Sequence, residues 1–241
     1  MSGHSKWKTI KHKKALTDAK RSKVFSRVSR MISVAVRDKG PKPDQNIALR
    51  LAIEKAREVN MPGDNIQKII AKYSGDSKEQ LEIIQFEGYG PSGTAFIIDV
   101  ITDSRNRISQ EIRHMLASHG GSLAVPGSVL WMFEKFGVIT ASLDNTTFSN
   151  LEELAIEAGA HDIVEEDSKA IILTKPEDLY VVKTSLEEAG IKTEGAQLEY
   201  RAKNTIDISD EGLKKKVEAL YDELDDNEDV QEIFDNISFS V

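Results

Sequence analysis

Apolar side chains recur at helical spacing in the first third of the chain, over residues 20–75. In segment 24–35 they lie three and four positions apart, which places them on one face of a helix. Segment 44–59 has the same spacing, and segment 62–74 repeats it after a proline that suits the first turn of a helix. The pattern therefore predicts a unit of three helices.

Strand-like patterns follow these helices. Segments 83–86 and 94–101 are rich in β-branched and aromatic residues, and the glycine-rich stretch 88–93 separates them, so a hairpin is predicted. A helix with a polar cap is expected over residues 103–117. A further strand is predicted at residues 129–133.

The second half of the chain contains a weak internal repeat. Residues 138–200 show two helices that each end in Ala-Gly, with strand patterns around them in the order β-α-β-β-α-β, which is typical of a ferredoxin-like domain. A helix at 210–224 and a strand at 230–237 complete the chain. A lone terminal helix and strand need a sheet to join, and the sheet of residues 80–135 is the one left incomplete.

These elements predict an α+β, multidomain fold. An N-terminal three-helix domain is followed by two α/β domains, and the last, ferredoxin-like domain is inserted into the middle one. The predicted boundaries are 1–21 for a flexible basic arm, 22–79 for the three-helix domain, 80–136 plus 203–241 for the discontinuous α/β domain, and 137–202 for the ferredoxin-like domain.

Composition narrows the classes of function. The 241 residues are 39% hydrophobic and 30% charged, as in ordinary globular proteins, and no cysteine occurs. Disulfides, cysteine nucleophiles, iron–sulfur clusters and thiolate zinc sites are therefore excluded. The longest apolar runs fall far short of the ~20 residues that a membrane span needs, so we expect a cytoplasmic protein without a membrane partner.

Charge is distributed very unevenly along the chain. Residues 1–80 contain 19 basic and 8 acidic residues, a net charge of +11, whereas residues 81–241 contain 13 and 32, a net charge of −19. Residues 1–39 alone contain twelve basic and two acidic residues. A charge run is usually a solvated face, but a run this dense repels itself unless an anion stabilises it.

Nucleic acid is the partner that this basic segment predicts. Each phosphate that a lysine or arginine neutralises releases counterions, which favours binding. Trp7 and His12 could stack on unpaired bases. The alternative is that the arm docks on the acidic domains of its own chain, and the oligomeric state, monomer or dimer, stays open. The candidate nucleic-acid-binding residues are Lys6, Trp7, Lys8, Lys11, His12, Lys13, Lys14, Lys20, Arg21, Lys23, Arg27 and Arg30.

Three short motifs suggest other sites only weakly. Stretch 88–93 matches the dinucleotide motif G-x-G-x-x-G, but a strand rather than a helix is expected after it. Stretch 225–229 begins like a calcium loop, yet Val230 and Asn236 replace the required glycine and glutamate, so a solvated acidic turn is expected. Stretch 103–107 is expected to be a helix cap with surface arginines, and a binding role is its alternative.

No catalytic residue, metal or cofactor is predicted. His114 and His119 are five positions apart, which does not place them on one helix face, and His4 and His12 lie in the basic arm, where a metal ion would be repelled. The sequence contains no nucleophile elbow, phosphate-binding loop or zinc-protease motif. A hydrolase that uses carboxylates of the acidic domains is the alternative to a protein without enzymatic activity.

Several motifs at consistent spacings resemble the YebC/PmpR family of probable transcriptional regulators. The matching stretches are Gly3-His4-Ser5-Lys6-Trp7, Ile10-Lys11-His12-Lys13-Lys14-Ala15, Asp18-Ala19-Lys20-Arg21, Asn60-Met61-Pro62, Asp64-Asn65-Ile66, Glu87-Gly88-Tyr89-Gly90-Pro91, Thr102-Asp103, Arg105-Asn106-Arg107, His119-Gly120-Gly121 and Gly127-Ser128-Val129. The chain departs from the family pattern at Gly63, at Ser92 and at the residues before Gly127.

The resemblance implies three domains, no enzymatic activity and a role in gene expression through nucleic acid. Members of the family are described as DNA-binding transcriptional regulators. Others, including mitochondrial relatives, are described as translation factors that act on ribosomes stalled at proline-rich sequence. Both functions are therefore expected alternatives, with DNA or ribosomal RNA as the partner.

Overall fold

The computed structural model describes residues 18–74, 81–166 and 168–239. The chain divides into two compact units, one of which is discontinuous. Of the described residues, 18–134 and 201–239 belong to one unit, and the other unit is Lys135–Tyr200. Within the described ranges, no helix is both long enough and apolar enough to span a membrane.

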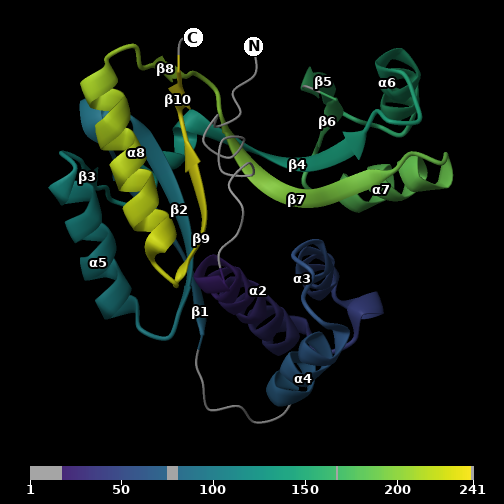
Figure 1. The fold of residues 1–241 in the computed structure, drawn as a ribbon, viewed down its shortest axis with the longest axis horizontal. Coiled ribbons are helices and arrows are strands. Elements are labelled where there is room, and N and C mark those ends of the chain that lie inside the picture. Colours follow the sequence, from purple (N-terminus) through teal and green to yellow (C-terminus); the bar gives the residue numbers. More distant parts are fainter. Residues whose placement is uncertain (1–17, 75–80, 167, 240–241) are drawn as a thin grey trace. The chain divides into compact units, whose positions relative to one another are not determined.

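Three helices form the first part of the discontinuous unit (Figure 1). They are α2 (Asp18–Lys39), α3 (Ile47–Glu58) and α4 (Gly63–Tyr73), with a short 3-10 turn at Pro43–Gln45. Their apolar faces meet in one core, in which Ile32, Leu49 and Ala56 are completely buried. The predicted three-helix unit is confirmed.

Asn46 fixes the connection between the first two of these helices. Its side-chain oxygen accepts from the Leu49 N–H, which caps α3, and its amide group donates to the carbonyls of Ala35 and Gly40 at 2.7 and 2.8 Å. All the polar atoms of this fully buried amide therefore have partners, as a buried polar group requires.

An antiparallel sheet follows in the same unit, with strand order β3-β1-β2-β9. The strands are β1 (Glu82–Tyr89), β2 (Ala95–Thr102), β3 (Ser122–Leu123) and β9 (Val230–Asp235). The long hairpin β1–β2 is confirmed, with Tyr89 opposite Ala95 at its turn. A strand follows stretch 88–93 directly, which rules out a dinucleotide fold there.

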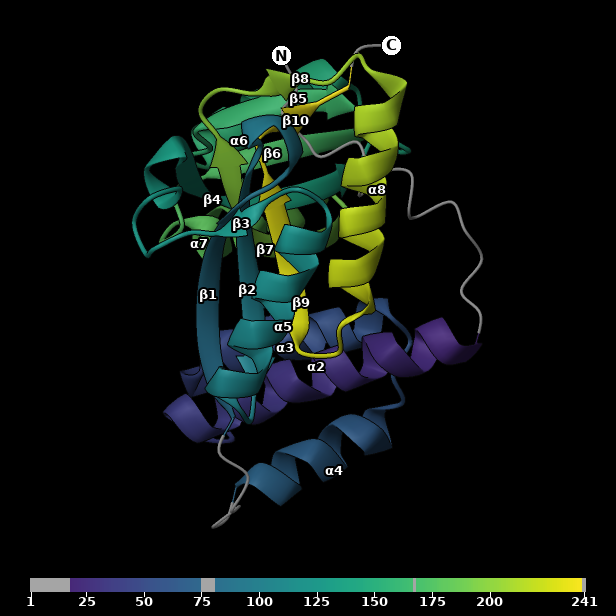
Figure 2. The ribbon, with the colours of Figure 1, turned by 90° about the vertical axis from the view of Figure 1, so that its left-hand side faces the viewer.

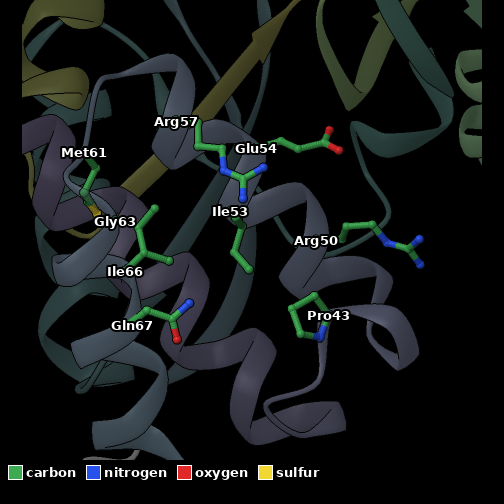
Figure 3. A pocket seen from close by; sticks show the side chains of 9 residues that line it. All are labelled: Pro43, Arg50, Ile53, Glu54, Arg57, Met61, Gly63, Ile66 and Gln67. Carbon is green, nitrogen blue, oxygen red and sulfur yellow. The ribbon is translucent and has the colours of Figure 1, made fainter. Parts of the chain in front are cut away.

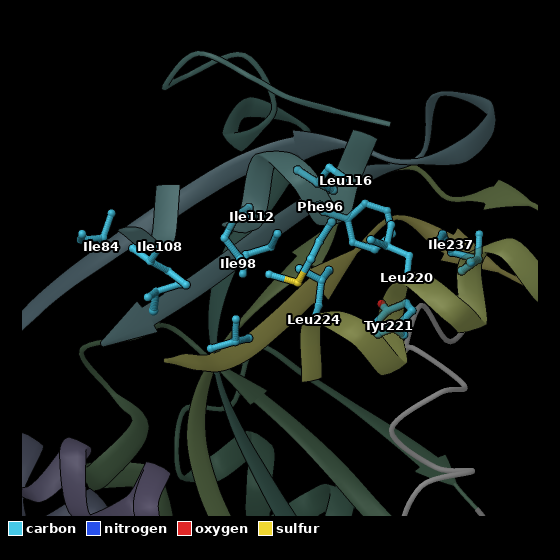
Figure 4. Close-up of a cluster of buried hydrophobic side chains, with 14 of the residues drawn as sticks. Ile84, Phe96, Ile98, Ile108, Ile112, Leu116, Leu220, Tyr221, Leu224 and Ile237 are labelled. Atoms are coloured by element: carbon cyan, nitrogen blue, oxygen red, sulfur yellow. The ribbon is translucent and has the colours of Figure 1, made fainter. Parts of the chain in front are cut away.

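Helices α5 (Arg105–Ser118) and α8 (Glu211–Asp226) cover one face of this sheet (Figure 2). The core between them contains Phe96 and Ile98 from the sheet, Ile112 from α5 and Leu220 from α8, all completely buried (Figure 4). The ring of Tyr221 contacts Phe96 edge-on at 5.6 Å between centroids. Residues from both ends of the chain thus build a single core.

The unit Lys135–Tyr200 contains a second antiparallel sheet, with strand order β5-β6-β4-β7. Ile139, Leu151, Ile172 and Leu186 form the centre of its core. Its elements are β4 (Phe133–Ser142), α6 (Phe148–Glu157), β5 (Asp162–Glu166), β6 (Lys169–Thr174), α7 (Leu179–Glu188) and β7 (Thr193–Ala202). The α+β class, with helices first and antiparallel sheets after them, is confirmed.

Two of the predicted strands are wrong in extent. The strand predicted at 129–133 is a 3-10 turn at Leu130–Met132, because the N–H groups of Val129 and Leu130 donate to a carboxylate instead of a neighbouring strand. The strand predicted at 230–237 is interrupted at Asn236, whose side chain accepts from the Ala95 N–H. Beyond it, β10 (Ile237–Ser238) pairs with β8 (Ile206–Asp207) instead.

Candidate nucleic-acid interface

The predicted nucleic-acid-binding residues fall into three groups. Lys20 lies in the first turn of α2, and Arg21 in the same helix is exposed. Lys23, Arg27 and Arg30 follow at steps of three and four along α2. The remaining predicted residues lie outside the described part of the chain; they are Lys6, Trp7, Lys8, Lys11, His12, Lys13 and Lys14.

The second group faces the acidic loop, which we define as residues Asp225–Asp229, at the end of helix α8 and just beyond it. Lys23 Nζ lies 2.8 Å from a carboxylate oxygen of Asp226. Arg27 lies 2.8 Å from a carboxylate oxygen of Asp225 and also donates to the backbone carbonyls of residues 225 and 227. Two cations one turn apart on α2 thus bind carboxylates that lie about two hundred residues away in the sequence.

Asp229 is the centre of this contact. It is only 2% exposed, and its carboxylate accepts from Arg30, from the Thr102 hydroxyl at 2.8 Å and from Arg107 at 2.6 Å. Arg30 donates in addition to the Ile101 carbonyl at 3.0 Å. The buried carboxylate thereby connects α2, the end of β2 and the start of α5.

Hydrogen bonds hold Asp229 in its charged form. Burial by itself would raise the pKa of Asp229, but the hydrogen bonds from Arg30, Thr102 and Arg107 outweigh it, and the pKa is lowered. The pKa of Arg107 is raised, first by its hydrogen bond with Asp103 and then by Asp229. We call the ion pairs of Lys23, Arg27, Arg30 and Arg107 with these carboxylates the acidic junction.

The acidic junction corrects two expectations from the sequence. Stretch 225–229 is not a solvated acidic turn throughout, because Asp229 is buried and the Asp225 side chain is only 25% exposed. Stretch 103–107 is more than a helix cap, since Arg107 reaches the buried carboxylate, and the Ser104 side chain makes no capping hydrogen bond. The predicted surface role holds for Arg105, whose side chain is 62% exposed.

The outer surface of the three helices carries the remaining basic residues. Residues 18–74 contain 13 basic and 6 acidic residues, which gives a net charge of +7. Exposed members of the basic set are Arg21, Arg37, Lys39, Lys42, Arg57, Lys68 and Lys72, which we call the exposed basic surface. Only Arg21 among them belongs to the residues predicted from the sequence, because the others lie beyond the dense basic run before residue 31 and are spaced widely from the end of α2 to the end of α4.

A cavity of about 460 Å³ opens between α3 and α4 (Figure 3). Its lining includes the buried side chains of Ile53, Met61 and Ile66 and parts of Arg50 and Arg57. Sequence reasoning missed this site. The sequence does contain a pattern that indicates it, namely the i, i+3, i+7 spacing of residues 50, 53 and 57. This spacing places two arginines beside an apolar position on one helix face.

A second buried carboxylate belongs to Glu87 in β1. It is 6% exposed and accepts the backbone N–H groups of Gly127, Val129 and Leu130 at 2.5, 2.6 and 2.8 Å. Burial would raise the pKa of Glu87, but these three hydrogen bonds lower it. The contact explains why two of the matching motifs, around residues 87 and 127, occur together, and it fixes a loop that presents Trp131 to solvent.

Within residues 18–74, 81–166 and 168–239, no three His, Asp or Glu side chains are placed to hold a metal ion. His119 lies 3.3 Å from Glu223 and 2.9 Å from the Met115 carbonyl. The chemistry that this surface offers is the binding of anions by lysine and arginine.

Comparisons with known proteins agree with the motifs. Residues 5–76 match a family model described as the TACO1/YebC protein N-terminal domain, and residues 81–237 match the TACO1/YebC second and third domain. A relative from Halothermothrix orenii is 44% identical over 239 residues, which are 98% of this chain and 94% of the relative. One from Nitratiruptor is 46% identical over 238 residues, 98% and 100% of the two chains.

Both relatives are named "Probable transcriptional regulatory protein". A solved structure is also similar, the crystal structure of a conserved hypothetical protein from Aquifex aeolicus. It is 42% identical in sequence, has a TM-score of 0.89 and covers 98% of each chain. The similarity therefore extends over the full length in sequence and in fold.

Proposed function

The chain belongs to the TACO1/YebC family, as its motifs indicate, and from this premise we propose that it is a non-enzymatic nucleic-acid-binding regulator of gene expression. We assign it the role of a DNA-binding transcriptional regulator, which agrees with the names of its relatives. The observation that carries the proposal is the net charge of +7 on residues 18–74, with seven cations exposed on the three helices.

The basic arm and the exposed basic surface would bind phosphates of the nucleic-acid backbone. Such contacts position a protein on a duplex but do not read its sequence. Lys6, Lys8, Lys11, Lys13 and Lys14 would extend the contact beyond the helices. Specificity would then arise from dimerisation or from the shape of the DNA.

A ribosome-binding translation factor that relieves stalls at proline-rich sequence is the second candidate function. Trp7 and His12 stand among lysines, and aromatic rings between cations suit the unpaired bases of folded RNA. Segments rich in lysine and arginine also fold on binding RNA. The acidic α/β domains would then contact proteins or tRNA.

We also infer that residues 137–202 form a ferredoxin-like domain inserted into an α/β domain of residues 80–136 and 203–241. The inference is supported by the order of the elements β4 to β7 along the chain and by the strand order β5-β6-β4-β7. Strand β9 lies antiparallel beside β2, so the last part of the chain contributes to the sheet of the first hairpin.

Co-sedimentation with 70S ribosomes tests the two functions. Full-length protein and a variant without residues 1–21 are centrifuged with ribosomes at ~50 and ~200 mM salt, with and without excess duplex DNA. A contact with six or more phosphates weakens by about a thousandfold over that salt range. Retention on ribosomes despite the DNA, abolished in the truncated protein, supports the translation factor, whereas removal by DNA supports the transcriptional regulator.

A pair of charge-reversal variants provides the matched control. Lys13→Glu/Lys14→Glu changes two neighbouring lysines of the arm, and Lys215→Glu/Lys216→Glu makes the same change on the exposed side of α8. We expect the first variant to lose binding and the second to keep it. Equal affinity of both variants and of the unchanged protein would contradict the proposal.

A further inference from the structure

The cavity between α3 and α4 has the size and the lining of a small-molecule site. Its volume of about 460 Å³ lies within the range of about 300–1,000 Å³ that is usual for ligand pockets. Side chains of α3 form one wall and side chains of α4 the other (Figure 3). The site is therefore separate from the acidic junction, to which α2 contributes.

The lining combines an apolar floor with a polar rim. Ile53, Met61 and Ile66 are 4–9% exposed and belong to the core of the three helices. Polar side chains complete the lining, namely Arg50, Glu54, Arg57 and Gln67. The Arg57 guanidinium points toward Ile53, whereas the side chains of Arg50 and Glu54 extend away from the apolar residues (Figure 3).

We propose that this cavity binds one unpaired nucleotide of an RNA strand, with its base on the apolar floor and its phosphate at Arg57. The inference rests on the second candidate function, the binding of folded RNA, since it names a subsite for one unpaired nucleotide. A base is a flat apolar ring with hydrogen-bonding edges, which the Gln67 amide can read. Guanidinium groups bind phosphate through paired N–H donors.

The charge of the surrounding domain favours a phosphate-bearing ligand over an acidic side chain of a protein. The exposed cations Arg57 and Lys68 lie on α3 and α4. Strand phosphates on both sides of the bound nucleotide would therefore meet positive charge as well, whereas a single acidic side chain would use only the rim. Both ligands remain distinguishable by experiment.

Gly63 offers a way to fill the cavity without disturbing the core. It is the first residue of α4 and lines the cavity, its backbone is not left-handed, and a Cβ atom there would meet nothing within 4 Å. Gly63→Leu should therefore fold normally and occupy the space of the base. Asn65→Leu, an exposed change in the same helical turn that is not part of the lining, is its control.

The test compares two RNA hairpins that differ by a single unpaired nucleotide, measured by fluorescence anisotropy with full-length protein. We expect the bulged hairpin to bind about tenfold more tightly, a modest value for one stacked base. Gly63→Leu and Arg57→Ala should abolish this preference. Asn65→Leu should keep it, and Lys68→Ala should weaken binding of both hairpins equally.

The outcomes separate this inference from the proposed function. Equal affinity for the two hairpins, or a preference that survives in Gly63→Leu, would overturn the nucleotide subsite and leave nucleic-acid binding in place. No binding of either hairpin or of duplex DNA would overturn both proposals. Displacement of the bulged hairpin by a short aspartate-rich peptide, but not by a single-stranded oligonucleotide, would assign the cavity to a protein partner instead.

Discussion

Two sets of cations on the three helices differ in what surrounds them. Arg27 and Arg30 of α2 meet carboxylates of the acidic loop, and their side chains are 15% and 23% exposed. Lys39 and Lys42, at and just beyond the end of the same helix, are exposed. In the sequence these residues look alike, since all of them belong to one basic stretch.

The difference shows which cations are available to a ligand. Asp229 is buried among two guanidinium groups and a hydroxyl, so each of these partners balances a charge that water cannot reach. Removing one member of such a set leaves an uncompensated buried charge. Removing a cation of the exposed basic surface leaves no buried charge without a partner. These are the cations that we assign to nucleic acid.

The largest expected effect is on stability at the acidic junction. Asp229→Ala should lower the free energy of unfolding by about 3 kcal/mol, because it leaves Arg30 and Arg107 without their shared carboxylate. Glu228→Ala, next to it in the acidic loop, should cost less than about 0.5 kcal/mol, since that side chain is 70% exposed and lies 3.8 Å from Arg30.

Urea unfolding followed by circular dichroism measures both variants. If Asp229→Ala costs no more than Glu228→Ala, the acidic junction does not differ from an ordinary surface, and the comparison between the two sets of cations fails. Binding of duplex DNA at low salt serves as a second measurement, because both variants retain every residue of the exposed basic surface.

The dependence of stability on pH should come from the buried carboxylates. The pKa values of Asp229 and Glu87 are lowered in the folded protein, so the unfolded chain binds more protons as the pH falls. Their contribution is complete above about pH 5, where the unfolded carboxylates are also charged, and disappears as the pH falls through the folded values. Each group can contribute a slope of up to about 1.4 kcal/mol per pH unit.

Variants assign this dependence to particular residues. Asp229→Asn and Glu87→Gln should each flatten the loss of stability below about pH 5, because each removes one titrating group with a lowered pKa. An unaltered slope in Asp229→Asn would show that the hydrogen bonds of the acidic junction do not persist in solution.

Much of the secondary structure was predictable because local patterns determine it. The three helices, the hairpin of β1 and β2, and helices α6 and α7 all follow from spacing and turn residues. The strand expected at 129–133 failed because periodicity does not reveal that Glu87, some forty residues away, accepts the N–H groups of this segment. An apolar run looks the same whether its backbone pairs with a strand or with a side chain.

The arrangement of charges was harder to predict than the elements. That Arg30 and Asp229 belong together depends on β9 pairing with β2, which is a contact between distant parts of the chain. The cavity beside Arg57 likewise requires α3 and α4 to pack at a particular distance. Sequence reasoning located the basic segment, but only the fold separates cations that stabilise the protein from those that a ligand can reach.

A moderate effect is expected from charge reversal on the exposed basic surface. Lys39→Glu/Lys42→Glu should weaken binding of duplex DNA and reduce the slope of log affinity against log salt by about one for each phosphate that the variant no longer neutralises. Stability should change by less than about 0.5 kcal/mol, because both side chains are exposed. Unchanged affinity and slope would remove these two lysines from the interface, and titration of labelled DNA at several salt concentrations measures both quantities.

The smallest effect is expected at the edge of the acidic junction, where Lys23 contacts Asp226. The Asp226 side chain is 80% exposed, so water and salt screen this pair, and Asp226→Asn should change the free energy of unfolding by less than about 0.5 kcal/mol. The same change leaves Lys23 without its carboxylate, and affinity for nucleic acid should rise by no more than a few fold. A rise of that size at low salt, absent in Lys23→Ala/Asp226→Asn, would place Lys23 at the boundary between the two sets of cations. A decrease in affinity instead would show that Asp226 orients Lys23 for its ligand.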